Sequence, residues 1–176
     1  MNQTFKLGLA LFLVLGAVLL RFLPHPANFA PIAALALFSG VYLNKKYALV
    51  VPVAAMLVSD FFIGFYDWRL MSVVYSCFLI SGLVGLWFKN HKNLATIIGG
   101  TLVSSLVFFL ATNLAVWAFS SWYHHNWQGL LYCYSLALPF FRNTMFGDLF
   151  YVGVLFGLYE MVLILAKRQI LARKTI

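Results

Sequence analysis

The side chains best suited to metal chemistry are the thiol of Cys77 and the imidazole of His25. Sulfur and imidazole nitrogen bind soft or borderline transition metals. His25 lies between Pro24 and Pro26, which predicts an extended, rigid loop that can hold the ring over a cavity. Two ligands without regular spacing do not build a zinc site. The pair suits a metal that arrives inside an organic macrocycle and needs only axial ligands.

Several further polar side chains make up the candidate binding set around this pair. The set comprises Asn28, Asp60, Asp67, Arg142 and Asn143. Structural roles are the alternative for its individual members. Asp67 could pair with Arg69 in a loop, and Asp148 could cap a helix and offset the charge of Arg142. Cys77 could be a small buried hydrophobe, as could Cys133.

The composition identifies the solvent in which these side chains are held. Of the 176 residues, 64% are hydrophobic and 9% are charged. So much apolar surface cannot be kept from water in one soluble core, so the chain is predicted to be an integral membrane protein in contact with the lipid bilayer. We found no soluble domain or clear internal repeat, and residues 1–176 are therefore interpreted as a single transmembrane domain.

An all-α fold with six transmembrane helices is predicted, because a helix needs roughly 20 apolar residues to cross about 30 Å of hydrocarbon. The expected limits are 5–23, 29–43, 47–66, 70–88, 94–119 and 145–166, the second being short for a full span. The apolar segment Gly129–Phe141 is too short to span and ends near Pro139. It is predicted to be an interfacial or re-entrant helix on the outer side.

The basic residues orient this bundle. If Lys6 is inside, the positive-inside rule also places inside Lys45, Lys46, Lys89, Lys92, Lys167, Arg168, Arg173 and Lys174. Both termini are then cytoplasmic. The net charge of +8 follows from this bias, and its spread over separate loops and tails excludes a nucleic-acid partner. Glu160 is expected to pair or snorkel toward the inner end, near Lys167.

The polar residues converge at one level of the predicted bundle. At about 1.5 Å of rise per residue, Asp60, Cys77 and Asn113 all lie roughly 10 Å below the outer surface. The outer loops add His25 and Arg142. Ionisable groups inside a membrane are costly, so a convergent set of them indicates a functional site that opens outward.

Three segments resemble a known family. Arg21–Leu35, the Ser59-Asp60 pair and Phe140–Asp148 are similar to small bacterial membrane proteins related to the S components of energy-coupling-factor vitamin transporters. The resemblance covers most of the chain, and implies a multi-pass protein of the bacterial cytoplasmic membrane that binds a vitamin from outside. Many S components dock on a shared module through Ala-x-x-x-Ala in the first helix, where this chain has Gly8-x-x-x-Phe12-x-x-x-Gly16. This departure favours a solitary protein over one that requires the energy-coupling-factor module.

Within that group, the thiol in the fourth span and the loop histidine are similar to the solitary, cobalamin-binding BtuM type. This resemblance implies uptake of cobalamin, with Cys77 as the cobalt ligand, His25 on the opposite axial side, and Asp67 and Arg142 seating the corrin ring. Reductive decyanation of cyanocobalamin is implied as chemistry of the bound cofactor. Aromatic cavity walls are expected from Phe29, Tyr66, Tyr75, Trp117 and Phe141.

Three other functions stay open at this stage. The first is a receptor of the same type for a different small vitamin or precursor, with Cys77 merely packed. The second is a membrane enzyme that uses Asp60, His25 and Cys77 as acid, base and nucleophile, although none of the common hydrolase or phosphate-loop motifs is present. The third is a non-catalytic protein of a membrane assembly, held through faces of small residues.

Overall fold

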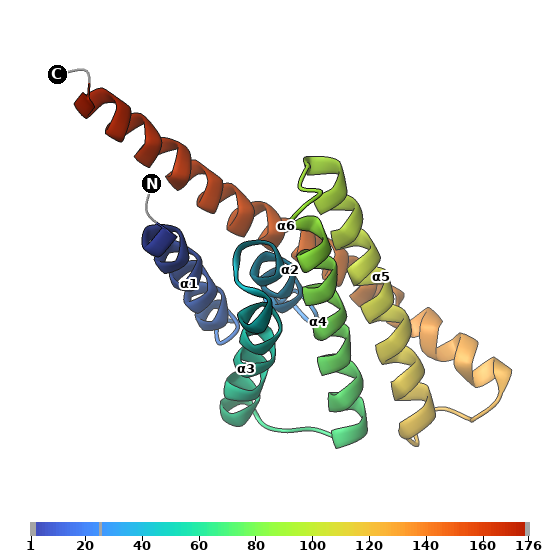
Figure 1. The fold of residues 1–176 in the computed structure, drawn as a ribbon. Coiled ribbons are helices and arrows are strands. Elements are labelled where there is room, and N and C mark those ends of the chain that lie inside the picture. Colours follow the sequence, from blue (N-terminus) through green and yellow to red (C-terminus); the bar gives the residue numbers. More distant parts are fainter. Residues whose placement is uncertain (1–2, 25, 175–176) are drawn as a thin grey trace.

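The computed structural model describes residues 3–24 and 26–174, and over these residues the chain is all-helical. The helices are α1 (Gln3–Leu20), α2 (Ile32–Tyr42), α3 (Lys45–Ile63), α4 (Trp68–Phe88), α5 (Leu94–Phe119) and α6 (Trp127–Lys174) (Figure 1). The predicted all-α fold is thereby confirmed. The first five helices begin and end within a few residues of the predicted limits, whereas the sixth is far longer than predicted.

Five of these helices, all except α2, are long and apolar enough to cross a membrane. Their outer surfaces carry large apolar side chains, such as Phe12, Phe61 and Leu94, which are 70% exposed or more. Such surfaces suit lipid, so the chain is a multi-pass membrane protein. The predicted span over 29–43 corresponds to α2, whose 11 residues rise only about 16 Å, roughly half the thickness of the hydrocarbon core.

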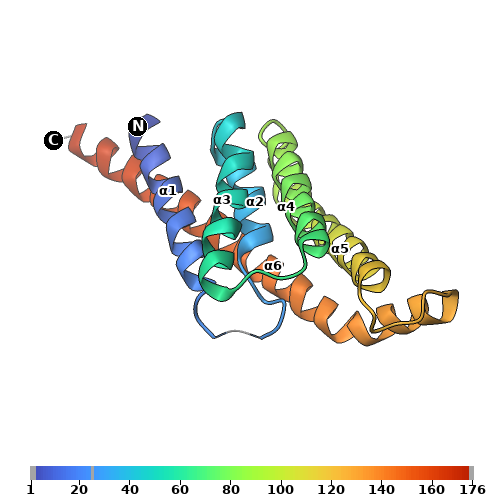
Figure 2. The ribbon, with the colours of Figure 1, turned by 90° about the horizontal axis from the view of Figure 1, so that it is seen from below.

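Helix α2 is the centre of the bundle. Every residue from Ile32 to Val41 is buried, and the helix packs against each of the other five. Figure 2 shows it enclosed between α3, α4 and α6. A helix that is apolar on all sides belongs in such a position. Burial inside protein also explains how so short an apolar segment is accommodated at membrane depth.

Glycines allow α2 and α4 to touch near one end of the bundle. A Cβ atom on Gly85 would lie 2.4 Å from the carbonyl oxygen of Leu37, and one on Gly40 would lie 2.5 Å from that of Gly82. No side chain fits at such separations. Beside this contact, the Phe38 ring meets the ring of Phe156, from α6, edge-on at 5.5 Å between centroids. Helix α2 is therefore closely packed against α4 and α6 at this end of the bundle.

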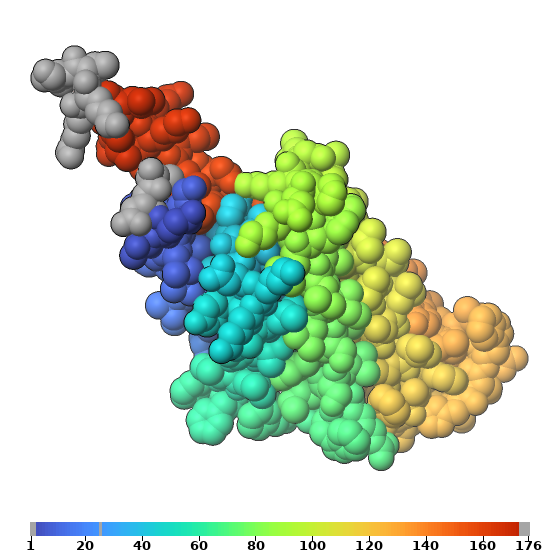
Figure 3. Space-filling model, viewed as in Figure 1, coloured from blue at the N-terminus to red at the C-terminus, as the bar shows by residue number. Residues whose placement is uncertain are grey.

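The prediction of a separate interfacial or re-entrant helix over Gly129–Phe141 is wrong. That segment is the first part of α6, a single helix of 48 residues that continues through Pro139. Figure 2 shows α6 bending in its orange first third, the part that holds this proline, and proline is the usual cause of such bends. At about 72 Å, α6 is more than twice the thickness of the hydrocarbon core. Both of its ends project from the body of the molecule (Figure 3).

Polar contacts gather the basic segments at one end of the bundle. The Lys89 ammonium donates to the carbonyl oxygen of Leu43 at 3.2 Å, and the Lys92 ammonium pairs with Glu160. The Tyr159 hydroxyl donates to the carbonyl oxygen of Lys6 at 3.4 Å. Figure 1 shows the start of α1, the end of α6 and the α4–α5 connection on this side. We call it the basic end. The described loop residues 21–24, 26–31, 64–67 and 120–126 form the opposite end.

Candidate binding cavity

A cavity of about 770 Å³ occupies the half of the bundle away from the basic end. Its wall is built by the α1–α2 loop, the first turns of α2 and α4, the last turns of α3 and α5, and the first half of α6. The lining residues are Arg21, Phe22, Leu23, Pro24, Asn28, Ala30, Ile32, Ala33, Met56, Ile63, Tyr66, Leu70, Val74, Phe78, Phe108, Phe109, Thr112, Asn113, Val116, Ala137, Phe140, Thr144 and Asp148. Exposed loop residues in the wall place its mouth at the opposite end.

Most of this wall is apolar, and a few polar groups interrupt it. The Thr112 hydroxyl and the Asn113 amide donate to backbone carbonyl oxygens one turn earlier in α5, at 2.7 and 2.8 Å. The Tyr66 phenol stands in the α3–α4 loop, where burial, together with the nearby Asp60 carboxylate, raises its pKa to about 12. The phenol therefore keeps its proton at neutral pH and can donate to a ligand.

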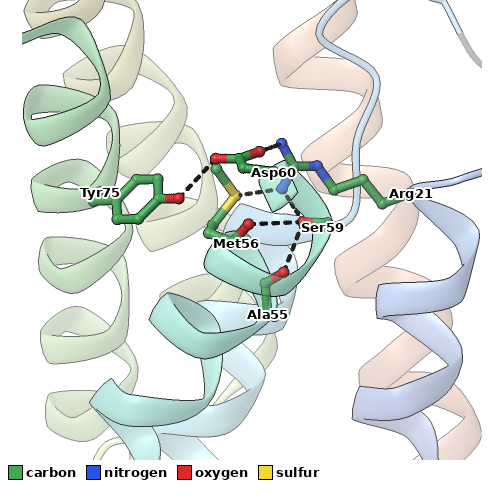
Figure 4. Close-up of polar contacts among 6 residues, drawn as sticks. All are labelled: Arg21, Ala55, Met56, Ser59, Asp60 and Tyr75. Carbon is green, nitrogen blue, oxygen red and sulfur yellow. Dashed lines mark hydrogen bonds and ion pairs between the residues drawn. The ribbon is translucent and has the colours of Figure 1, made fainter. Parts of the chain in front are cut away.

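The most elaborate polar contact in the wall joins Arg21 to α3 (Figure 4). The Arg21 guanidinium donates to the Asp60 carboxylate at 2.6 Å and to the Met56 sulfur at 2.9 Å, and it also contacts the Ser59 hydroxyl. The Tyr75 hydroxyl, from α4, donates to the other oxygen of Asp60 at 2.7 Å. The side chain of Asp60 is 1% exposed and that of Arg21 15%. We call these residues, Arg21, Met56, Ser59, Asp60 and Tyr75, the Arg21 cluster.

The local sequence explains how the Arg21 cluster is positioned. Helix α1 ends just before Arg21, which leaves that side chain free to reach across to α3. Helix α3 ends at Ile63, three residues after Asp60, and Gly64 caps it with a φ of 117°, which is open to glycine but strained for other residues. The Gly64 N–H donates to the Asp60 carbonyl oxygen at 2.8 Å, so the last turn that carries the carboxylate is closed.

A second acid, Asp148, lines the cavity from α6. It is 3% exposed, and the Ser105 hydroxyl, from α5, donates to its Oδ2 atom at 2.6 Å. The role suggested by the sequence, a cap of the last helix that offsets Arg142, is not what the structure shows. Asp148 lies in the interior of α6, and Arg142 is exposed and does not pair with it.

The structure brings two members of the predicted binding set to the cavity. Asn28 lines the wall, in a left-handed backbone conformation with a φ of 62° that asparagine tolerates. Asp60 lies directly behind the wall and holds Arg21 in it. Of the five predicted aromatic residues, Tyr66 is in the wall, and Tyr75 contributes through its hydrogen bond to Asp60.

Three other members of that set have different positions. Asp67 caps α4 by accepting the backbone N–H groups of Arg69 and Leu70, at 2.9 and 3.2 Å. Arg142 is exposed and outside the lining. The Asn143 side chain donates to the Ala27 carbonyl oxygen at 3.1 Å, which ties the α1–α2 loop to α6.

Of the two predicted cobalt ligands, Cys77 and His25, the structure describes only Cys77. Cys77 is 4% exposed and lies outside the cavity lining, although Phe78 and Val74 of the same helix belong to it. His25 lies outside the described residues. In the part of the chain that the structure describes, no three His, Cys, Asp or Glu side chains are grouped to hold a metal ion. The assignment of Cys77 and His25 as axial ligands stays a prediction.

Two residues at the site were not in the predicted set. Arg21 is the partner of Asp60, and Asp148 is a cavity residue. A sequence signal existed for each: Arg21 ends a long apolar run without a nearby acid in sequence, and Asp148 stands within one. Their partners, on α3 and α5, are distant in sequence and could not be inferred from spacing.

The chain belongs to a family described as "Family of unknown function (DUF6580)", whose model matches residues 1–172. No curated protein and no solved structure matches it.

Proposed function

We propose that this member of DUF6580 is a membrane receptor or transporter that takes up a small organic molecule from the side opposite its basic end. The cavity of about 770 Å³ is the observation that carries the proposal. Ligand sites are concave, mostly apolar and provided with a few placed polar groups, and typically measure about 300–1,000 Å³. This cavity fits that description in size and in lining.

The charge distribution gives the direction of uptake. Lysines at the basic end mark the cytoplasmic side by the positive-inside rule, and in a bacterial cell this would be the inner membrane. The cavity occupies the other half of the bundle, so it faces outward in the state described. Release to the cytoplasm then requires a second state, because the basic end is closed by the α2–α4 contact and the aromatic residues beside it.

The geometry favours a ligand the size of a small vitamin or its precursor over a corrinoid. Cobalamin with its side chains exceeds the drug-sized ligands that cavities of this volume enclose. The cobalt ligand suggested by the resemblance, Cys77, is buried outside the lining. Among the predicted functions, the receptor for a different small vitamin or precursor therefore agrees best with the cavity.

A thermal-stability assay with a filled cavity tests the proposal. Thr112→Trp places an indole in the space, whereas Leu114→Trp adds the same ring to the lipid-facing side of α5, where Leu114 is 47% exposed. Purified protein would be heated with each member of a panel of water-soluble vitamins and precursors that includes cyanocobalamin. A ligand that binds only the folded state, at 100 times its Kd, stabilises by about 2.7 kcal/mol.

We expect at least one small panel member to stabilise the wild type and Leu114→Trp, but not Thr112→Trp. If no compound stabilises the wild type, or if both tryptophan variants respond alike, small-molecule binding in the cavity is contradicted. Stabilisation by cyanocobalamin alone, with an absorption spectrum that changes in Cys77→Ala, would replace the small ligand by a corrinoid.

A further inference from the structure

From the charge balance of the cavity, we infer that its ligand carries a positively charged group, which Asp148 binds. This inference rests on the proposed function, since it names the chemical class of the molecule that enters the same cavity. Asp148 is the relevant residue because it lines the space, is almost fully buried, and belongs to α6, which contributes no residue to the Arg21 cluster.

The two acids near the cavity differ in their partners. Asp60 is matched by the Arg21 guanidinium at 2.6 Å and by the Tyr75 hydroxyl at 2.7 Å. Asp148 has the neutral Ser105 hydroxyl on Oδ2, and among the described residues no Lys, Arg or His pairs with it. Arg21 and Asp60 cancel one another, so within the described chain the site has one negative charge in excess when Asp148 is ionised.

A buried carboxylate without a counter-charge is unfavourable, and a cationic ligand would remove that penalty on binding. Arg21, the one Lys or Arg among the described lining residues, is already engaged by Asp60, Met56 and Ser59, so an anionic ligand finds no unpaired cation among them. The aromatic residues of the wall, Phe78, Phe108, Phe109 and Phe140, suit the body of an organic cation, since ring faces attract positive charge. The charge and the lining thus favour the same class of ligand.

Two fluorescent probes that differ in charge but hardly in shape provide the test. The cation is dimethylaminostyryl-N-methylpyridinium, and the control is its parent, dimethylaminostyrylpyridine, which lacks the N-methyl group and is uncharged at mildly alkaline pH. Saturable binding would be measured on the full chain in detergent, and binding that Thr112→Trp removes is counted as cavity binding. We expect the cation to bind the wild type at least about tenfold more tightly than the parent, as for a close charge pair.

Variants of Asp148 test whether this acid causes the tighter binding of the cationic probe. Asp148→Asn keeps the shape and the hydrogen bond from Ser105 but removes the charge, so the two probes should then bind equally. Asp148→Glu keeps the charge and should retain the preference for the cation. Glu160→Gln removes an acid at the basic end and should leave the ratio of the two affinities unchanged.

The outcomes separate this inference from the proposed function. Cavity binding of both probes with equal affinity, or a preference that persists in Asp148→Asn, overturns the cationic ligand and leaves small-molecule binding intact. If only anions in the ligand panel stabilise the protein, the cationic ligand is likewise overturned and small-molecule binding is retained. Absence of cavity binding by either probe and by every panel member contradicts both. The comparison of the two probes on the wild type, with Thr112→Trp as the reference for cavity binding, needs no variant of Asp148, so it decides even if Asp148→Asn does not fold.

Discussion

The two halves of this bundle are built from the same helices and differ in how they are filled. Toward the basic end, α2 and α4 touch through Gly40 and Gly85, and aromatic rings of α2 and α6 pack beside this contact. Toward the opposite end, Ala33 of the same α2 and Ala30 of the loop before it line a cavity. Small residues have opposite consequences in the two places: they allow contact where two helices converge, and they leave space where the helices stay apart.

The two ion pairs of the described chain show the same contrast. In the pair at the basic end, the side chains of Lys92 and Glu160 are 32% and 42% exposed. In the pair at the cavity, that of Asp60 is 1% exposed and that of Arg21 15%. A pair open to solvent is worth little, whereas breaking a buried one leaves an uncompensated charge. The comparison therefore predicts a large difference between the effects of removing one acid or the other.

Removal of the buried acid should have the largest effect. Asp60→Ala leaves the Arg21 guanidinium partly buried without its counter-charge and removes the acceptor of the Tyr75 hydroxyl. We expect a loss of about 3–5 kcal/mol of stability, the usual range for one partner of a buried pair. Thermal unfolding of the purified protein would measure it. The double variant Arg21→Met with Asp60→Ala should recover part of the loss, and failure to recover any would contradict the ion pair as its cause.

The sequence indicates one member of the Arg21 cluster, Asp60, but not the partner of that acid. The Ser59-Asp60 pair in an apolar run signals a site, because an acid at membrane depth must have a partner. The identity of that partner depends on how α1 packs beside α3, which composition and spacing do not specify. The same limit applies to Ser105 and Asp148, which are 43 residues apart.

The helix limits are easier to predict from the sequence than the site. Five apolar runs are bounded by prolines, caps or basic residues, and the predicted ends lie close to the observed ones. The predicted start of the last helix is wrong because it treats Pro139 as the end of a separate segment. A proline inside a helix can bend the helix instead of ending it. Depth alone does not specify whether Cys77 lines the cavity, because it does not tell which side of α4 faces that space.

The close contact between α2 and α4 is tested by adding one methyl group at Gly85. In Gly85→Ala the new Cβ atom would lie 2.4 Å from the Leu37 carbonyl oxygen, so α2 and α4 must separate. Overpacking of this kind costs about 1–3 kcal/mol. Gly153→Ala on α6 is the matched control, because a Cβ atom there meets nothing within 4 Å, and it should be neutral or slightly stabilising. Equal effects of the two changes, measured by thermal unfolding, would contradict the close contact.

The smallest effect is expected at the basic end, where Glu160 accepts hydrogen bonds from the Lys92 ammonium and from the Tyr42 hydroxyl, the latter at 2.6 Å. Glu160→Gln removes the charge and keeps an acceptor for both donors. Because the two side chains are 32% and 42% exposed, we expect a loss of no more than about 1 kcal/mol, which should shrink as salt is added. Lys92→Met should cost a similar amount, and the double variant little more than either. If Glu160→Gln were as damaging as Asp60→Ala, the difference in exposure would not govern the two pairs, and the basic end would have to be regarded as a buried electrostatic centre.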